Sequence, residues 1–172
     1  VRDNGIGIPE NQLTSAILRF HTSKISSLEQ LISVNTLGFR GEALSSIASV
    51  SEMVIVSSCG ENLGSELKVL NGNAEETKPS ANIGGTEVTI KNLFYNTPAR
   101  RKFLKTPRTE LRKIVNVVRR YGLAFPHIEF RLISDNRVDF HVKSESLEER
   151  IDHLLDPTYS RNLLPLNIIK GD

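Results

Sequence analysis

Two glycine-containing segments near the start of the chain have residue types and spacing suited to nucleotide binding. In Asp3-Asn4-Gly5-Ile6-Gly7, a carboxylate lies on a turn whose glycines let a planar base approach the backbone. Residues 38–44, Gly-Phe-Arg-Gly-Glu-Ala-Leu, form a glycine turn that is predicted to lead directly into a helix. The first amides of a helix lack backbone partners and carry the positive end of its dipole, so this turn is suited to binding phosphate. The two segments predict a single cavity for a nucleotide.

Each segment alone is also typical of an ordinary tight turn. Glycine-containing segments also occur in three other kinds of binding site, and the sequence excludes each of these. A calcium loop is excluded because Ile6 and Ile8 occupy positions where it needs oxygen ligands. A dinucleotide fingerprint is excluded because Glu10 stands where its third glycine is required. The sequence contains no Gly-x-x-x-x-Gly-Lys-Ser/Thr, which excludes a P-loop.

Composition limits the class of protein. The 172 residues are enough for one substantial core and the edge of a second domain. Cys59 is the only cysteine and has no partner for an intramolecular disulfide, and no signal peptide or membrane-length apolar run occurs, so we expect a reducing compartment and no membrane. Val1-Arg2 is typical of the end of a strand and Ile168-Ile169 of the start of one, so we expect an internal fragment of a longer protein.

The net charge of +2 does not by itself indicate a nucleic-acid partner. Basic side chains are nevertheless concentrated in residues 100–120, where Glu110 is the one acidic residue. Such a surface can attract phosphates, although charge alone favours a solvated helix face.

Hydrophobic periodicity and turn signals predict the elements that position these residues. Helices are predicted at residues 9–20, after Ser27, at 42–50 with Leu44, Ile47 and Ala48 facing inward, at 107–121 with Gly122 as the stop, and at 147–155 after the cap Ser146. Strands are predicted at residues 53–56, 67–69, 86–93, 128–132, 138–142 and 163–169, with tight turns at Asn71-Gly72 and Asp135-Asn136. Residues 21–37 are polar and are predicted to form a lid between the two glycine segments. The sum is an α+β fold with a mixed, mainly antiparallel sheet and helices on one face.

Four sequence blocks resemble the N-terminal ATPase region of the MutL family of DNA mismatch repair proteins. They are residues 1–8, 22–25, 37–47 and 92–104, and the similarity covers nearly the whole chain. The Asp-x-Gly-x-Gly pattern is shared by the wider GHKL superfamily of ATPases, whereas Gly-Phe-Arg-Gly-Glu-Ala-Leu and Phe-Tyr-Asn-Thr-Pro-Ala-Arg narrow the resemblance to MutL. The resemblance implies a two-layer α/β sandwich at residues 1–144, lacking its first helix and strands. It also implies that residues 145–172 begin a second domain of the ribosomal protein S5 domain 2 type.

The resemblance also implies roles for individual residues. Asp3 would accept a hydrogen bond from the adenine amino group, and guanine would place its O6 against the same carboxylate at a cost of about 1 to 3 kcal/mol. Thr86 would support the adenine site, although threonine is also common at the start of a strand. The ATP-binding set implied by the family motifs is Asp3, Gly5, Gly7, Thr22, Ser23, Lys24, Gly38, Phe39, Arg40, Gly41, Glu42, Ala43, Leu44 and Thr86. Within it, Lys24 and Arg40 would contact phosphate, and Glu42 would be a carboxylate in the first turn of the helix rather than a base.

The block at residues 92–104 is interpreted mainly as structure. Phe94, Tyr95 and Phe103 are expected to be core and corner residues. The basic residues Arg100, Arg101, Lys102 and Lys105 are the candidate DNA contacts, and part of this group is expected to support the fold.

In this superfamily an upstream helix supplies a glutamate that activates water and an asparagine that holds Mg²⁺, and the second domain supplies a lysine to the terminal phosphate. None of the three matches a position in this chain, so we expect no catalytic residue and no metal ligand within it, and negligible ATPase activity from it alone. The resemblance implies an ATP-driven and Mg²⁺-dependent switch that dimerises with itself or a relative, and that works with DNA and a MutS-type mismatch-recognition protein. The expected location is the bacterial cytoplasm or the eukaryotic nucleus. The alternatives are a non-hydrolysing partner subunit and a topoisomerase or chaperone ATPase of the same superfamily.

Overall fold

A computed structural model describes residues 1–22, 38, 41–60, 63–155 and 162–164. These residues divide into two compact units, Val1–Phe103 and Leu104–Asp172. The helix predicted after Ser27, and residues 165–169 of the last predicted strand, lie outside the described residues. The α+β class with an antiparallel sheet is confirmed, whereas the domain boundary at residue 144 and the nature of the second domain stay predictions.

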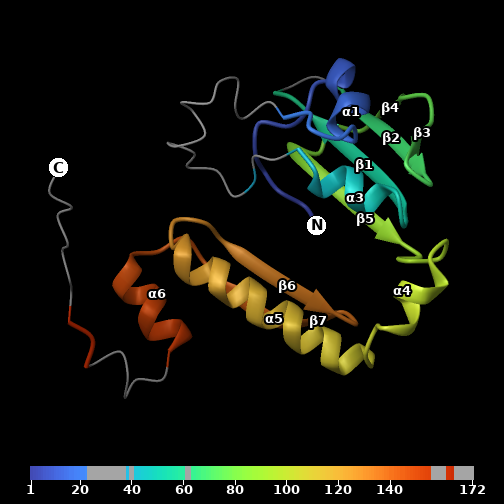
Figure 1. Cartoon of the computed structure of the whole chain (residues 1–172). Helices are drawn as coiled ribbons and strands as arrows, with labels where there is room; N and C mark the ends of the chain where they lie inside the picture. Colours follow the sequence, from blue (N-terminus) through green and yellow to red (C-terminus); the bar gives the residue numbers. More distant parts are fainter. Residues whose placement is uncertain (23–37, 39–40, 61–62, 156–161, 165–172) are drawn as a thin grey trace, which may run out of the picture. The chain divides into compact units, whose positions relative to one another are not determined.

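The first unit contains an antiparallel sheet of five strands (Figure 1). The strands are β1 (Glu52–Ser58), β2 (Gly64–Leu70), β3 (Asn73–Ala74), β4 (Lys78–Ser80) and β5 (Gly85–Lys91), in the order β3-β2-β1-β5 with β4 also paired to β2. The strand predicted at residues 53–56 is confirmed as part of β1, where the side chains of Met53 and Ile55 are buried. The predicted Asn71-Gly72 turn is confirmed, with φ angles of 52° and 77° that suit a tight hairpin. The short strand β4 was not predicted from the sequence, because three residues that include a proline give almost no strand signal.

The chain before the first glycine turn runs along the outer edge of β5. The Asp3 amide donates to the Thr86 carbonyl at 2.9 Å, and the Val88 amide donates to the Val1 carbonyl at 2.8 Å. Arg2 pairs with Glu87 as an isolated antiparallel bridge. The extended conformation predicted for Val1-Arg2 is confirmed, and this pairing brings Asp3 next to Thr86 although 83 residues separate them in sequence.

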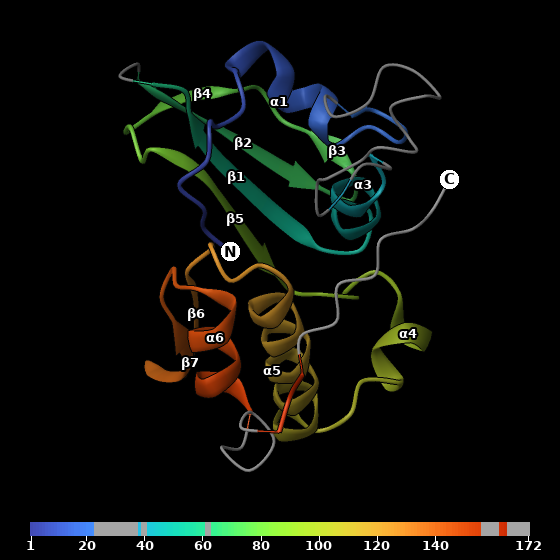
Figure 2. The same cartoon turned by 90° about the vertical axis from the view of Figure 1, so that its left-hand side faces the viewer.

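Helices α1 (Glu10–Ala16) and α3 (Ala43–Ala48) lie on the same side of this sheet (Figures 1 and 2). The core between them and the sheet is formed by Leu13, Ile17, Ala48, Met53, Ile55, Leu67 and Val69. Helix α1 ends four residues before the predicted Phe20, because Phe20 adopts a φ of 63° and donates its amide to the Gly41 carbonyl. The prediction that Ile47 faces inward was wrong: Ile47 is exposed, and Ser45 and Ala48 are the buried residues of α3.

The second unit packs α5 (Pro107–Ala124) against a hairpin of β6 (Phe130–Ser134) and β7 (Arg137–Val142), with α6 (Leu147–Leu154) against α5 (Figure 2). The predicted Asp135-Asn136 turn is confirmed, with φ angles of 47° and 62°. The predicted stop at Gly122 was wrong, because α5 continues to Ala124 and Gly122 is buried within it. A Cβ atom on Gly122 would lie 3.2 Å from the ring of Phe140, so glycine is used here for close packing rather than for ending the helix.

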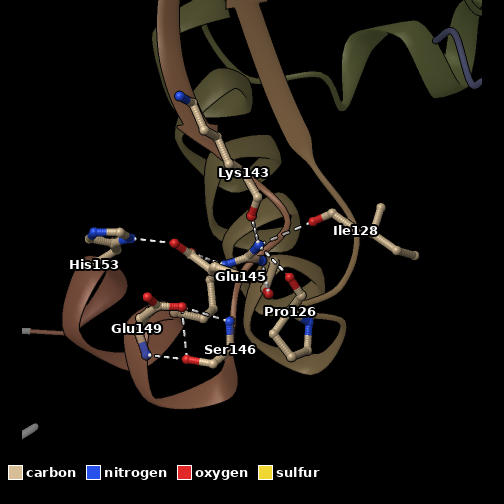
Figure 3. Close-up of polar contacts among 9 residues, drawn as sticks. Pro126, Ile128, Lys143, Glu145, Ser146, Glu149 and His153 are labelled. Carbon is tan, nitrogen blue, oxygen red and sulfur yellow. Dashed lines mark hydrogen bonds and ion pairs between the residues drawn. The ribbon is translucent and has the colours of Figure 1, made fainter.

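The start of α6 is fixed by a capping box. Ser146 accepts a hydrogen bond from the Glu149 amide, and the Glu149 carboxylate accepts one from the Ser146 amide, as Figure 3 shows. The bond from the Ser146 amide, followed by one from the Ser146 hydroxyl to the same carboxylate, lowers the pKa of Glu149 below its ordinary value. The cap predicted at Ser146 is confirmed.

Arg150 is fully buried in the second unit and holds the loops around α6 together. Its guanidinium donates to the Glu145 carboxylate at 2.5 Å and to the backbone carbonyls of Gly122, Pro126, Ile128 and Lys143. Figure 3 shows Pro126, Ile128, Lys143 and Glu145 gathered around these bonds. Glu145 accepts a second hydrogen bond from His153. The bond from Arg150, followed by that from His153, lowers the pKa of Glu145. The stabilising effect of this carboxylate is therefore present at neutral pH and is lost as the pH falls through its lowered pKa.

Within the described part of the chain, no helix combines the length and the apolar character needed to cross a lipid bilayer.

Candidate functional site

The first unit contains a cavity of about 1100 Å³ between the first glycine turn, α1, the start of α3 and the start of β5. Every described residue of the ATP-binding set expected from the sequence lines it: Asp3, Gly5, Gly7, Thr22, Gly38, Gly41, Glu42, Ala43, Leu44 and Thr86. Ser23, Lys24, Phe39 and Arg40 lie outside the described residues. The two glycine segments therefore border one cavity, as their sequences predict.

Asp3 is held so that one carboxylate oxygen is fixed. Its Oδ1 accepts hydrogen bonds from the Gly5 amide at 2.9 Å and from the Thr86 amide at 3.2 Å. Among the described residues no donor lies at its Oδ2, and the side chain is exposed at the cavity. Asp3 can therefore accept a hydrogen bond from a ligand without losing the bonds that orient it.

Two glycines allow the first glycine turn to lie against neighbouring strands, because at each of them two backbone segments pass very close to each other. Gly85 has a φ of 115°, and a Cβ atom there would lie 2.2 Å from the Asp3 carbonyl oxygen. Gly7 has a φ of 76°, and a Cβ atom there would lie 2.1 Å from the Ser58 carbonyl oxygen. Neither position accepts a side chain without movement of the main chain.

Gly7→Ala is expected to destabilise the first unit by about 2 kcal/mol, because the clash with Ser58 adds to the cost of a left-handed residue. Gly60→Ala is the matched control, since Gly60 has a φ of 61° but no described atom within 4 Å of the place that a Cβ atom would take. Thermal unfolding of both variants measures the difference. Equal shifts in midpoint would show that the close contact at Gly7 contributes nothing.

The opposite wall is tied to the segment that follows α1. The Phe20 amide donates to the Gly41 carbonyl at 3.1 Å, and a Cβ atom on Gly41, whose φ is 62°, would lie 2.3 Å from the His21 carbonyl oxygen. Helix α3 has only six residues and is shorter than the helix predicted at residues 42–50, so the positive charge at its N-terminus is weaker than that of the predicted helix. Glu42 is the N-cap residue of α3, and the prediction that it lies in the first turn was wrong.

Several residues of the cavity were not predicted from the sequence. The further lining residues are Ile6, Ile8, Gln12, Ser15, Ala16, His21 and Val88. Gln12, Ser15 and Ala16 share one face of α1, while Leu13 and Ile17 face the core. The four-residue spacing of Leu13 and Ile17 marks the face of the helix that meets the core. The positions on the neighbouring face that border the cavity could have been found from this spacing.

No protein-family model matches the chain. Among curated proteins, the DNA mismatch repair protein MutL of Thiobacillus denitrificans is 40% identical over 172 residues, covering 99% of this chain and 29% of the relative. MutL of Chlorobium phaeobacteroides is 43% identical over 166 residues, covering 96% of this chain and 27% of the relative. The chain belongs to the MutL family. It spans less than a third of the length of these MutL relatives.

Solved structures agree with the MutL assignment. The Aquifex aeolicus MutL ATPase domain complexed with ADP superposes with a TM-score of 0.69 at 33% identity, covering 89% of this chain and 54% of that one. The N-terminal domain of a DNA repair protein superposes with a TM-score of 0.71 at 25% identity, covering 91% of this chain and 46% of that one. The predicted GHKL-type fold is therefore confirmed for this MutL region.

The MutL block at residues 92–104 forms a corner of the first unit. Tyr95 donates its hydroxyl to Asn71 Oδ1 at 2.5 Å, and Asn96 donates to the same oxygen at 3.0 Å and to the Ser49 carbonyl at 2.9 Å. These bonds join the chain after β5 to the β2–β3 turn and to the end of α3, which supports a structural role for Tyr95. Phe103 is 80% exposed, so the prediction that it is a core residue was wrong.

The candidate DNA contacts of this MutL region are exposed. Arg100, Arg101 and Lys102 lie on α4 (Pro98–Lys102), a short helix that was not predicted, and Lys105 lies in the second unit. Their exposure leaves them accessible to a partner, and their role in DNA binding stays a prediction.

Proposed function

We propose that this chain is the ATP-binding part of a MutL-family mismatch repair ATPase. The observation that carries the proposal is the single cavity bordered by Asp3 and Thr86 on one side and by Gly41 to Leu44 on the other. The membership in the MutL family and the ADP complex of the Aquifex aeolicus relative support it.

The residues around the cavity fit ATP. The adenine amino group would donate to Asp3 Oδ2, which has no donor among the described residues, and Thr86 would lie beside the base. Guanine would bring its O6 against the same carboxylate, leaving both acceptors without a proton. Gly38, Gly41 and the following residues would approach the phosphates through their backbone amides, with Ser23, Lys24 and Arg40 as proposed side-chain contacts.

We propose that the protein ligand of Mg²⁺ lies outside the described residues. Among them, no group of three or more histidine, cysteine, aspartate or glutamate side chains is placed to hold a metal ion. We place the Mg²⁺ ligand and the general-base glutamate of the family upstream of this sequence, and the lysine for the terminal phosphate in the second domain, with the first domain ending at residue 144. What these residues contribute to hydrolysis is binding and orientation of the nucleotide.

The full-length protein is proposed to use ATP as a switch in mismatch repair. Nucleotide binding would bring two N-terminal regions together, either as a homodimer or with a relative, and residues 21–37 are the proposed lid over the nucleotide. The proposed partners are DNA and a MutS-type mismatch-recognition protein, in the bacterial cytoplasm or the eukaryotic nucleus. Arg100, Arg101, Lys102 and Lys105 are the proposed DNA contacts.

ATP turnover by the full-length protein and by residues 1–172 tests this proposal. We expect turnover by the full-length protein and negligible turnover by the fragment, because the proposed base, metal ligand and distal lysine lie outside it. ATP binding without turnover by the full-length protein would instead favour a non-hydrolysing partner subunit. Turnover by the fragment at the rate of the full-length protein would show that the catalytic residues lie within residues 1–172, contrary to the proposal.

A further inference from the structure

A buried serine hydroxyl lies behind the cavity wall that carries Asp3 and Thr86. Ser57 belongs to β1 and is 1% exposed. Its Oγ lies 2.7 Å from the Ile8 amide nitrogen, 3.1 Å from the Gly85 carbonyl oxygen and 2.9 Å from Thr86 Oγ1. Ser57 therefore joins the end of the first glycine turn to the start of β5.

The number of protons decides how these three contacts are made. A hydroxyl group has one proton to donate and two lone pairs that accept. The Ile8 amide fills one lone pair of Ser57. All three contacts are hydrogen bonds only if Ser57 donates to the Gly85 carbonyl and the Thr86 hydroxyl donates to Ser57. If Ser57 instead donated its proton to the Thr86 hydroxyl, no proton would lie between Ser57 and the Gly85 carbonyl. Two oxygens would then face each other in a buried site, which is unfavourable.

The favoured arrangement fixes what the wall offers to a ligand. The Thr86 proton points back toward Ser57, so the Thr86 oxygen is left to accept hydrogen bonds only. Asp3 also presents an acceptor, because its Oδ1 is already bonded to two amides and its Oδ2 faces no described donor. A wall with acceptors alone matches an amino group at position 6 of a purine and opposes a carbonyl oxygen there.

We propose that Ser57 is a positioning residue that holds the Thr86 proton away from the cavity and thereby makes the wall select 6-amino over 6-oxo purines. The inference rests on the proposed function, because it requires the base of ATP to lie against Asp3 and Thr86. Ser57 acts through Thr86 and does not itself touch the nucleotide.

The test compares the affinities of the full-length protein for ATP and for inosine triphosphate, whose base carries a carbonyl oxygen at position 6. In Ser57→Ala the Thr86 proton is free to turn toward the cavity, so the preference for ATP is expected to fall about tenfold. Ser51→Ala is the matched control, since Ser51 is also fully buried and donates to the Ile47 carbonyl at 2.7 Å away from this wall. Its ratio of affinities is expected to equal that of the wild type.

Thr86→Val provides a second measurement if Ser57→Ala fails to fold. It is expected to weaken ATP more than inosine triphosphate, because it removes an acceptor for the amino group. A loss that is equal for both nucleotides in Ser57→Ala, or a larger loss for inosine triphosphate in Thr86→Val, would overturn the inference. A wild-type protein that does not bind ATP would instead refute the proposed function itself.

Discussion

Asp3→Asn is expected to lower the affinity of the full-length protein for ATP about 100-fold while leaving its fold intact. Asparagine has the same shape as aspartate, so its side-chain oxygen can still accept from the Gly5 and Thr86 amides. Its amide nitrogen must then occupy the place of Oδ2 and face the adenine amino group. The asparagine amide and the adenine amino group are both donors and cannot bond to each other. The variant therefore loses the hydrogen bond between the amino group and the charged carboxylate, and charge-assisted bonds of this kind are strong.

Calorimetric titration with ATP measures this change, and Asp135→Asn is the control. Asp135 is exposed at the β6–β7 turn in the second unit, where its φ of 47° also suits asparagine. Asp135→Asn should bind ATP as the wild type does. A dissociation constant for Asp3→Asn within about threefold of the wild-type value would remove Asp3 from the adenine site.

The residues of the two glycine segments that border the cavity were predictable because each motif has a local backbone requirement. Gly7 and Gly41 both have positive φ angles and both approach another backbone segment too closely for a side chain. The closeness of Asp3 and Thr86 was different, since it depends on the pairing of the first three residues with β5. No local pattern gives that pairing, and the sequence predicted it only through the resemblance to MutL.

Long-range packing explains the predictions that were wrong. Gly122 is a helix stop by local rules, but in α5 it leaves room for Phe140 and Arg150, which come from β7 and α6. The role of Ser57 was also hidden, because a serine that alternates with Met53 and Ile55 on a strand gives no sign of its partners. Its three contacts come from Ile8, Gly85 and Thr86, which only the folded chain brings together.

The burial of Arg150 is the clearest feature that local sequence does not predict, because an arginine on a short helix is usually exposed. Here four backbone carbonyls and the Glu145 carboxylate converge on it. Arginine suits this position because its planar guanidinium has five N–H donors, whereas lysine has three on a single nitrogen. The acceptors come from α5, from the segment before β6 and from the segment after β7, so this one side chain crosslinks most of the second unit.

Arg150→Met is therefore expected to destabilise the second unit by about 3 to 5 kcal/mol, because it leaves buried acceptors and an unpaired carboxylate behind. Arg150→Lys should recover only part of this loss. Arg120→Met is the control, since Arg120 is exposed on α5 and methionine is a good helix former. Hydrogen exchange of the backbone amides of α5, β6 and β7 measures the local opening free energy. Protection in Arg150→Met equal to that in Arg120→Met would show that the observed bonds do not stabilise the unit, and that packing of α5 on the hairpin is sufficient.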